Sequence, residues 1–441
     1  MKYYSTNKNT PVVSLKEAVI KGLANDNGLF MPDHINKFDP SFFDKIQNLS
    51  FQEISFEVAK KFFGDDIEET KLKEIVFETL NFDFPVVKVT DSVYSLELFH
   101  GPTLAFKDVG ARFMARLLNY FLNDRQKQVN VLVATSGDTG SAVANGFLGV
   151  DGIHVFVLYP KGKVSKIQES QFTTLGKNIT ALEIDGTFDD CQHLVKTAFL
   201  DDELNEKLIL TSANSINVAR FLPQAFYYFN AFARLKESGV LENKELVFSV
   251  PSGNLGNITA GLFAREIGLP VARFILANNA NNVVFKYLET GIYQPQPSVE
   301  TIANAMDVGA PSNFARILDL YKHSHKTISE IIKGFFYTDE EIGEIVRKVY
   351  YETGYLCDPH GACGFQALSE NLAENQVGVF LETAHPAKFT ETIESIIGKG
   401  KVQLPDKLAS FMKGEKKSTQ MGKEYKFFRE YLLNAVDIKN K

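Results

Sequence analysis

The sequence predicts an α/β protein with two open, mostly parallel α/β domains, preceded by a small and mostly helical N-terminal domain. From residue 84 onward, short apolar runs alternate with Gly-rich turns and helical stretches, and each run is nearly continuous in apolar residues. Continuous hydrophobicity indicates strands buried on both faces, as in parallel sheets covered by helices. The length of 441 residues provides for two or three domains of ordinary size.

The first part of the chain is typical of a helical lead-in domain. Helical patterns occupy residues 14–23 and 51–63, and polar turns such as 25–28 join them. We therefore assign residues 1–82 to this domain.

Five apolar runs are the clearest strands of the α/β body. They are residues 129–134, 153–158, 246–250, 273–277 and 377–381. We place a first α/β domain at residues 83–225 and a second at 226–441, with an amphipathic surface helix at 425–436. Ligands of open parallel sheets bind beyond the carboxyl ends of the strands, so we expect the ligand-binding residues in the turns after these strands.

Composition and charge exclude several classes of protein. The count of 47 Lys and Arg against 54 Asp and Glu gives a net charge of −7, which disfavours nucleic acid as a partner. No stretch approaches the roughly 20 apolar residues of a membrane helix. The sparse cysteines, Cys191, Cys357 and Cys363, show no metal-type pairing and fit a reducing compartment. We expect a cytoplasmic protein that binds neither membrane nor metal.

A turn rich in small residues, PSGNLGN at 251–257, follows the strand at 246–250 and opens a helix at 258–267. Successive backbone N–H groups of such a turn can point at one anion, aided by the helix dipole. The turn lacks the Lys-Ser or Lys-Thr pair of a nucleoside triphosphate loop and the first Gly-x-Gly of a dinucleotide loop. It is therefore a candidate phosphate site, and an ordinary strand-to-helix turn is the alternative.

A second turn, TSGDTGS at 135–141, opens the helix at 142–148. Its hydroxyl groups and the N–H groups of the helix suit a carboxylate or a phosphate. The carboxylate of Asp138 opposes a bare anion site unless it contacts a donor or caps the helix.

The third feature is the segment HGPTLAFKD at 100–108, ahead of a helix at 109–120. At a helix start and among apolar neighbours, the pKa of Lys107 should fall below its usual value of about 10.4, which makes its amine a nucleophile. A solvated surface lysine is the alternative. Together with a phosphate loop and a carboxylate-binding turn, however, an activated lysine is what a pyridoxal phosphate enzyme acting on an amino acid requires.

The fourth turn, ETAHPAK at 382–388, follows the strand at 377–381. The Thr383 hydroxyl could meet the pyridine nitrogen of such a cofactor. For His385 and Lys388 we expect helix capping or surface exposure.

Taken together, these motifs resemble the threonine synthase family of fold type II pyridoxal phosphate enzymes, over nearly the whole chain. The resemblance rests on the segments 3–6, 22–30, 100–108, 134–141, 214–220, 252–257, 305–314 and 383–389. It implies two α/β domains with the cofactor between them, and the conversion of O-phospho-L-homoserine and water to L-threonine and phosphate. It also implies a monomer or homodimer.

The resemblance further assigns roles to single residues. Lys107 would bind pyridoxal phosphate covalently and act as the catalytic residue. The cofactor-binding set would be Lys107, Phe106, Asp138, Gly253, Asn254, Leu255, Gly256, Asn257 and Thr383. Candidates for substrate binding are Thr135, Ser136 and Thr139 at the carboxylate, and Ser215, Asn217, Arg220 and Lys163 at the phosphate. Asp138 stands where many relatives of the wider fold type carry Asn.

Four alternatives remain open at this point, two for the whole chain and two for single residues. The chain could be another fold type II lyase, such as a threonine dehydratase or a β-replacing synthase, or a relative that keeps the fold without turnover. Arg220 could form a surface ion pair, and Lys163 lies in a Lys-rich run, 161–166, that is usually solvated.

Overall fold

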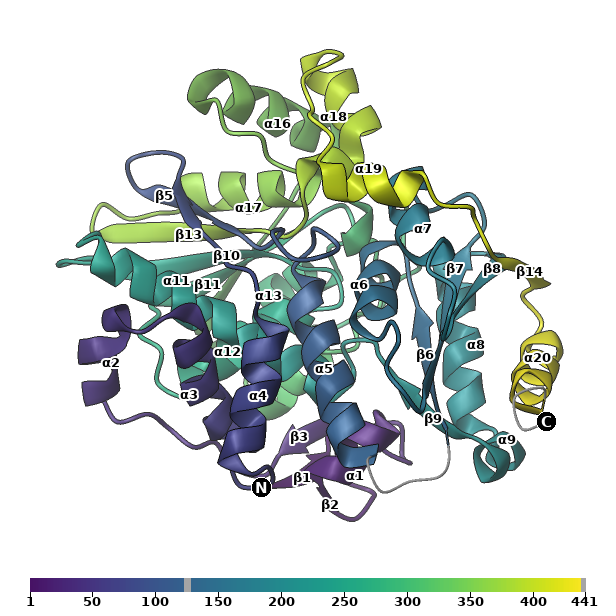
Figure 1. Cartoon of the computed structure of the whole chain (residues 1–441). Coiled ribbons are helices and arrows are strands. Elements are labelled where there is room, and N and C mark those ends of the chain that lie inside the picture. The colour runs from purple at the N-terminus through teal and green to yellow at the C-terminus, as the bar shows by residue number, and fades with distance from the viewer. Residues whose placement is uncertain (123–127, 438–441) are drawn as a thin grey trace.

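The computed structural model describes residues 1–122 and 128–437, so the last four residues of the predicted domain 226–441 lie outside the described residues. Two large sheets stand on either side of the paired helices α5 (Lys107–Leu122) and α6 (Asp138–Gly146), and a small third sheet lies at the N-terminal end (Figure 1). This arrangement agrees with two open α/β bodies and a lead-in domain.

The first large sheet has six strands in the order β12-β11-β10-β13-β5-β4, and every pair is parallel except β4 with β5. Its strands are β4 (Val86–Lys88), β5 (Val93–Glu97), β10 (Glu245–Pro251), β11 (Arg273–Asn278), β12 (Ile332–Phe336) and β13 (Gln376–Glu382). The predicted strands at 246–250, 273–277 and 377–381 are confirmed.

The second large sheet has five strands in the order β14-β8-β7-β6-β9, all parallel. They are β6 (Val129–Ala134), β7 (Ile153–Pro160), β8 (Ile179–Asp185), β9 (Ile209–Ser212) and β14 (Thr419–Gly422). Every residue of β6 and β7 is buried, which explains why these runs are continuously apolar. The predicted strands at 129–134 and 153–158 are confirmed.

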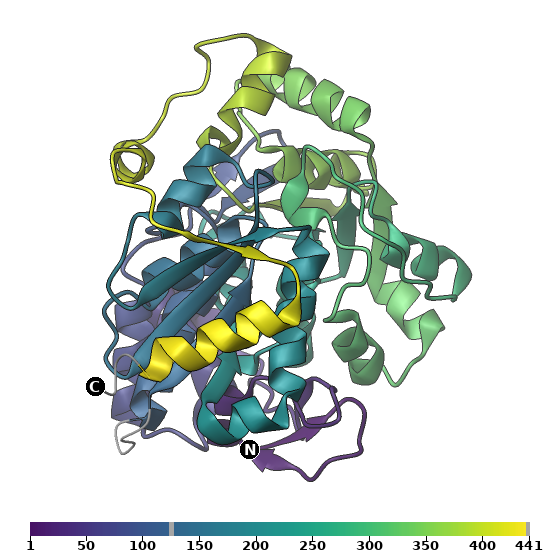
Figure 2. The ribbon, with the colours of Figure 1, turned by 90° about the vertical axis from the view of Figure 1, so that its right-hand side faces the viewer.

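The two sheets cut across the predicted domain boundaries. Strands β4 and β5 lie in the range 83–225 but join the first sheet beside β13, and β14 lies in the range 226–441 but joins the second sheet beside β8. Figure 2 shows β14 and the following helix α20 (Tyr425–Asp437) crossing back over the second sheet. Each predicted α/β domain therefore contributes strands to both sheets, because sheet membership is decided by long-range backbone pairing and not by position along the chain.

The N-terminal region is helical, as predicted, but also carries an antiparallel sheet in the order β2-β1-β3. Its elements are β1 (Lys2–Ser5), β2 (Val13–Ser14), α1 (Leu15–Lys21), β3 (Phe30–Pro32), α2 (Ser41–Lys45), η1 (Ile46–Asn48), α3 (Phe51–Phe63) and α4 (Glu69–Thr79). Capping boxes at Ser14 and Ser50 start α1 and α3. The bounds of α3 are those that the periodicity predicts.

The remaining helices pack on the two large sheets or, like α16, α18 and α19, against other helices (Figure 1). They are α7 (Lys166–Thr173), α8 (Phe188–Leu200), α9 (Asp202–Lys207), α10 (Val218–Phe221), η2 (Leu222–Gln224), α11 (Ala225–Glu237), α12 (Gly256–Glu266), α13 (Val283–Thr290), η3 (Asn304–Met306), α14 (Phe314–Leu320), α15 (His325–Ile331), α16 (Asp339–Thr353), α17 (Pro359–Ser369), η4 (Pro386–Phe389), α18 (Thr390–Ile397) and α19 (Asp406–Met412).

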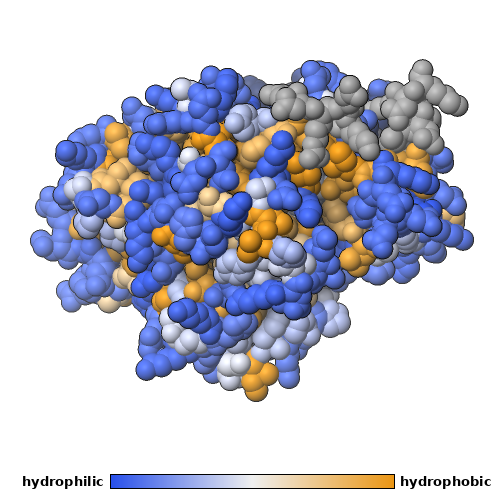
Figure 3. All heavy atoms as spheres, turned by 90° about the horizontal axis from the view of Figure 1, so that it is seen from below, coloured by the Kyte–Doolittle hydropathy of each residue, from blue (hydrophilic) through white to orange (hydrophobic). Residues whose placement is uncertain are grey.

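The surface is mainly hydrophilic where Figure 3 shows it, with apolar residues in patches between the polar ones. Within residues 1–122 and 128–437, no helix has the length and hydropathy needed to cross a bilayer.

The largest fully buried side chain, Arg316 of α14, joins the N-terminal sheet to the α/β body. Its guanidinium donates to the Phe30 carbonyl of β3 at 3.2 Å and to the carbonyls of Ser215 and Ile216 at 3.0 and 2.5 Å. It also lies 4.1 Å from the centroid of the Phe221 ring. One buried cation thus fixes the lead-in domain against the segment that precedes α10.

We expect Arg316→Met to lower the free energy of unfolding by on the order of 3 kcal/mol, because several buried carbonyls lose a charged donor at once. Urea unfolding followed by circular dichroism measures the change. Arg347→Met is the matched control, since Arg347 is exposed and donates only a long hydrogen bond, 3.4 Å, to Ile396. Equal unfolding midpoints for the two variants would contradict the structural role of Arg316.

Candidate active site

A cavity opens where the turns after β6, β10 and β13 meet the N-terminus of α5. This is the carboxyl-terminal edge of the parallel strands, where ligands of open α/β sheets bind. The sequence-predicted residues that line it are Phe106, Lys107, Ser136, Thr139, Ser215, Arg220, Gly253, Asn254, Leu255, Gly256, Asn257 and Thr383. The tertiary structure therefore brings together residues from five separate segments.

Lys107 is the first residue of α5, and the turn before it is held by the segment after β13. The Phe106 N–H donates to the Thr383 carbonyl at 2.9 Å, and the His385 N–H donates to the Leu104 carbonyl at 3.1 Å. This short antiparallel contact fixes the start of α5 beside Thr383, so both side chains reach the same cavity.

The environment of the Lys107 amine favours its neutral form. Burial lowers the pKa of Lys107 to about 8; the Asp138 carboxylate opposes this shift, and the charges of Lys388 and Arg220 assist it. The amine lies 5.3 Å from the centroid of the Phe106 ring. An amine with this pKa is a usable nucleophile and base near neutral pH.

The turn at 253–257 presents unpaired backbone donors to the cavity. Among the described residues, no acceptor is found for the N–H groups of residues 253–257, and α12 begins within this turn. A Cβ atom on Gly253 would lie 2.7 Å from the Met306 Cα, so only glycine fits here. Leu255 adopts the left-handed conformation, with φ 60°. Free N–H groups on a strained turn at a helix start are suited to a phosphate.

Side chains around this turn hold its shape from behind. Asn254 accepts from the Ser312 N–H at 2.6 Å, and the Asn313 amide donates to the Asn254 carbonyl at 2.9 Å. Ser215 accepts from both Asn254 and Asn313, at 2.9 and 3.0 Å. Ser215 therefore lines the cavity and also braces the anion-binding turn.

Arg220 is a buried cation without a protein partner. Its side chain is 2% exposed, and no described residue hydrogen-bonds to its Nε or Nη1. Burial, against the attraction of Asp108, lowers the pKa of Arg220 to about 10, so the guanidinium remains charged at neutral pH. Gly110 allows α10 to approach α5 this closely, because a Cβ there would lie 2.3 Å from the Arg220 carbonyl oxygen. A buried guanidinium with free donors in a cavity is a receptor for an anion.

The turn after β6 contributes a third group of donors. Ser136 and Thr139 line the cavity at the start of α6. Within the described part of the chain, their N–H groups have no acceptor. This agrees with the predicted site for a carboxylate.

The Asp138 carboxylate has hydrogen-bond donors, which the sequence alone could not identify. It accepts from the Lys388 ammonium at 2.6 Å and from the Gln168 amide at 2.9 Å. Burial alone would raise its pKa, but the charges of Lys388 and Lys107 outweigh burial, and the Asp138 pKa lies well below its usual range. Asp138 is therefore ionised beside the cavity.

The structure corrects the sequence prediction for three substrate-binding candidates. The Thr135 hydroxyl accepts from the N–H groups of Gly137 and Gly140 and shapes the turn. The Asn217 amide donates to the carbonyls of Val19 and Ser212 and caps α10 through the Ala219 N–H. The Lys163 ammonium is half-exposed and paired with Glu300. The polar groups of all three are engaged within the protein, and none of the three lines the cavity.

Two further side chains lie at the site: His360, for which the sequence leaves open whether it lines the site or stabilises a turn, and Lys388, which the sequence does not place there. His360 lines the cavity and is 1% exposed; its Nδ1 bonds Asp358 at 2.5 Å, and its Nε2 accepts from the Ala305 N–H at 3.1 Å. Lys388, expected at a cap or on the surface, is wholly buried against Asp138, whereas His385 does cap η4. No local signal in the sequence could have revealed the Lys388 pair, because its partner lies 250 residues away.

Comparison with known families agrees with this geometry. The model of the pyridoxal-phosphate dependent enzyme family matches residues 86–382. The models of the threonine synthase N terminus and of the threonine synthase C-terminal region match residues 2–80 and 361–432. The first match covers more than half of the chain and contains every candidate site residue except Thr383, which follows its last residue.

Individual relatives are similar over nearly the full length. A threonine synthase from Serratia marcescens is 45% identical over 409 residues, which is 93% of this chain and 94% of that protein. The crystal structure of Escherichia coli threonine synthase superposes with a TM-score of 0.93 at 42% identity, covering 99% of this chain and 100% of that one. A PLP-bound threonine synthase from Brucella melitensis gives 0.89 at 34% identity, with 98% of each chain covered. The chain belongs to the threonine synthase family of pyridoxal-phosphate dependent enzymes.

Proposed function

We propose that this chain converts O-phospho-L-homoserine and water to L-threonine and phosphate, with pyridoxal phosphate bound at Lys107. The observation that carries the proposal is the unpaired guanidinium of Arg220 in the cavity of Lys107. The free N–H groups at 253–257 offer a second anion site in the same cavity. Two anion sites suit a phosphorylated cofactor together with a phosphorylated substrate.

The residues present fit pyridoxal phosphate. The free N–H groups of residues 253–257 suit its phosphate, the Lys107 amine suits its aldehyde, and the Thr383 hydroxyl suits its ring nitrogen. Phe106 and Asp138 complete the cofactor-binding set. When bound, the cofactor supplies an electron sink for the carbon atoms next to the amine of the substrate.

The chain's own residues bind the substrate and move its protons. Ser136 and Thr139, at the start of α6, bind the substrate carboxylate. Arg220 and Ser215 bind the phosphate and stabilise it as it leaves. The Lys107 amine, once released from the cofactor, takes up and returns protons as a general base, as its depressed pKa allows.

We also propose that the protein works in a reducing compartment. All three cysteines are free and buried, which supports a reducing compartment such as the cytoplasm. A monomer or homodimer stays a prediction.

We expect the purified protein to release phosphate and threonine in equal amounts from O-phosphohomoserine, and Lys107→Ala to abolish both, because the variant lacks the amine that binds the cofactor and moves protons. Coupled phosphate detection and amino-acid chromatography measure the two products. Lys71→Ala, at an exposed lysine paired with Glu74, is the control that should keep full activity. Phosphate without threonine would instead indicate a lyase that releases a keto acid.

We expect Arg220→Met to lower kcat/KM for O-phosphohomoserine by 10²- to 10³-fold, or about 2.7 to 4 kcal/mol, the usual loss for a preorganised charge-stabilising donor. The visible absorbance of the bound cofactor should not change, since the donors at 253–257 remain. Arg116→Met serves as control, because Arg116 lies on α5 but pairs with Glu78 outside the cavity. Unchanged turnover in Arg220→Met would remove Arg220 from the substrate site.

The pKa of Lys107, about 8, predicts how fast the cofactor-free chain captures pyridoxal phosphate at different pH. Only the neutral amine reacts, so the rate should rise about tenfold per pH unit below pH 8 and level off above it. Stopped-flow absorbance measures the rate. A rate that keeps rising to pH 10 would indicate an ordinary, solvated lysine.

A further inference from the structure

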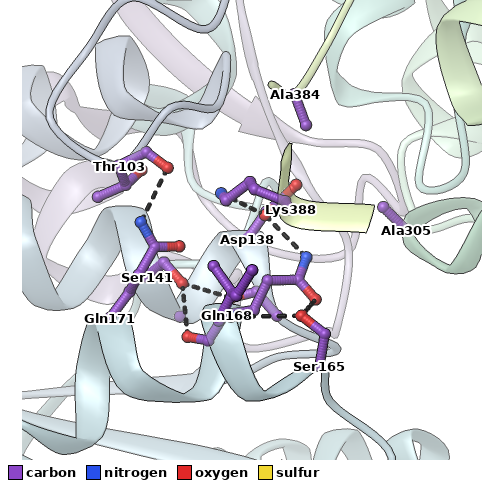
Figure 4. Close-up of polar contacts among 12 residues, drawn as sticks. Thr103, Asp138, Ser141, Ser165, Gln168, Gln171, Ala305, Ala384 and Lys388 are labelled. Carbon is purple, nitrogen blue, oxygen red and sulfur yellow. Dashed lines mark hydrogen bonds and ion pairs between the residues drawn. The ribbon is translucent and has the colours of Figure 1, made fainter. Parts of the chain in front are cut away.

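A fully buried ion pair lies beside the cavity, between Lys388 of η4 and Asp138 of α6. The Lys388 ammonium is 2.6 Å from the Asp138 carboxylate, and the two side chains are 0% and 3% exposed. Figure 4 shows the carboxylate between Lys388 and Gln168, whose amide donates to the same oxygen at 2.9 Å. The Asp138 carboxylate is thus neutralised by the Lys388 ammonium and also accepts a hydrogen bond from Gln168.

The backbone around Lys388 is held in place by a capped helical turn. Residues 386–389 form η4 directly after β13, and the His385 side chain caps η4 by accepting from the Ala387 N–H at 3.0 Å. Asp138 belongs to the helix that follows β6 in the other sheet. The pair therefore joins the two α/β bodies beside the cavity.

Lys107 is the other cation next to Asp138. The charged groups that act on Lys107 are Asp138 on α6, Lys388 on η4 and Arg220 on α10. Asp138 favours the protonated form of Lys107, whereas Lys388 and Arg220 favour the neutral form. Among the described residues, Asp138 forms its ion pair with Lys388 and none with Lys107.

We propose that Lys388 is a positioning residue: it neutralises the Asp138 carboxylate, so that Lys107 is not drawn into an ion pair and its amine stays free to react. A buried ion pair can often be replaced by apolar groups with little loss of stability. Its presence beside a reactive amine is therefore better explained by its effect on Lys107. The inference rests on the role proposed above for Lys107.

The test measures the reactivity of Lys107 without substrate or cofactor. The full-length, cofactor-free chain is treated with cyanate, which carbamoylates only neutral amines, across a range of pH. Mass spectrometry of the Lys107 peptide gives the midpoint of the pH profile. Lys71, exposed and paired with Glu74, is the internal control and should show the same profile in every variant. This readout does not depend on whether the chain makes threonine.

The expected shifts have opposite signs in the two single variants. In Lys388→Met, Asp138 loses the ammonium that is paired with it and still attracts the charge of Lys107, so the midpoint should rise from about 8 by at least one unit and the rate at pH 7 should fall about tenfold. In Asp138→Asn, Lys388 and Arg220 act unopposed, so the midpoint should fall below 8. The double variant should return to between these values, and Lys388→Arg should resemble the unchanged protein.

An unmoved midpoint in Lys388→Met, or shifts of the same sign in both single variants, would overturn the proposal. Circular dichroism establishes that each variant is folded. If Lys388→Met does not fold, Asp138→Asn and the double variant carry the test alone. The midpoint must then be lower in Asp138→Asn than in the double variant, and equal midpoints would overturn the proposal.

Discussion

The candidate site depends on a short antiparallel contact between the turn before α5 and the segment after β13. Two backbone hydrogen bonds, Phe106 to Thr383 and His385 to Leu104, hold these segments together although more than 270 residues separate them in the chain. The contact fixes the position of the first turn of α5, which contains Lys107. The segment after β13 continues into η4, which contains Lys388. A backbone contact of this kind tolerates many side chains, which leaves the residues on either side free to carry chemistry.

Behind the cavity, a second constraint holds the anion-binding turn. The buried Arg316 fixes the carbonyls of Ser215 and Ile216 and also donates to the Asn313 side chain at 2.5 Å. Asn313 and Ser215 in turn hold Asn254. Arg316 also donates to the Phe30 carbonyl, so the lead-in domain helps to hold the residues behind the site in place.

The balance of charge around the cavity favours anions. Lys107, Lys388 and Arg220 act together near one ionised carboxylate, Asp138, and only Lys388 is paired with it. The low effective dielectric of a buried site strengthens the attraction of the guanidinium for a phosphate. It also raises the free-energy cost of burying Arg220 without an anionic partner. An anionic group of a ligand that pairs with Arg220 relieves that cost.

The sequence by itself determined five of the buried strands and most of the predicted residues that line the cavity. Continuous apolar runs predict β6, β7, β10, β11 and β13, because strands covered on both faces admit few polar residues. The small-residue turn after β10 predicts the residues 253–257, and the segment 100–108 predicts Lys107. Only the tertiary structure decided which strands share a sheet, and which polar side chains face the cavity. Thr135 and Asn217 instead satisfy nearby backbone groups, while Lys388 pairs with a carboxylate 250 residues away. Periodicity and spacing report local burial, whereas the partner of a buried charge is chosen by long-range packing, which no local pattern records.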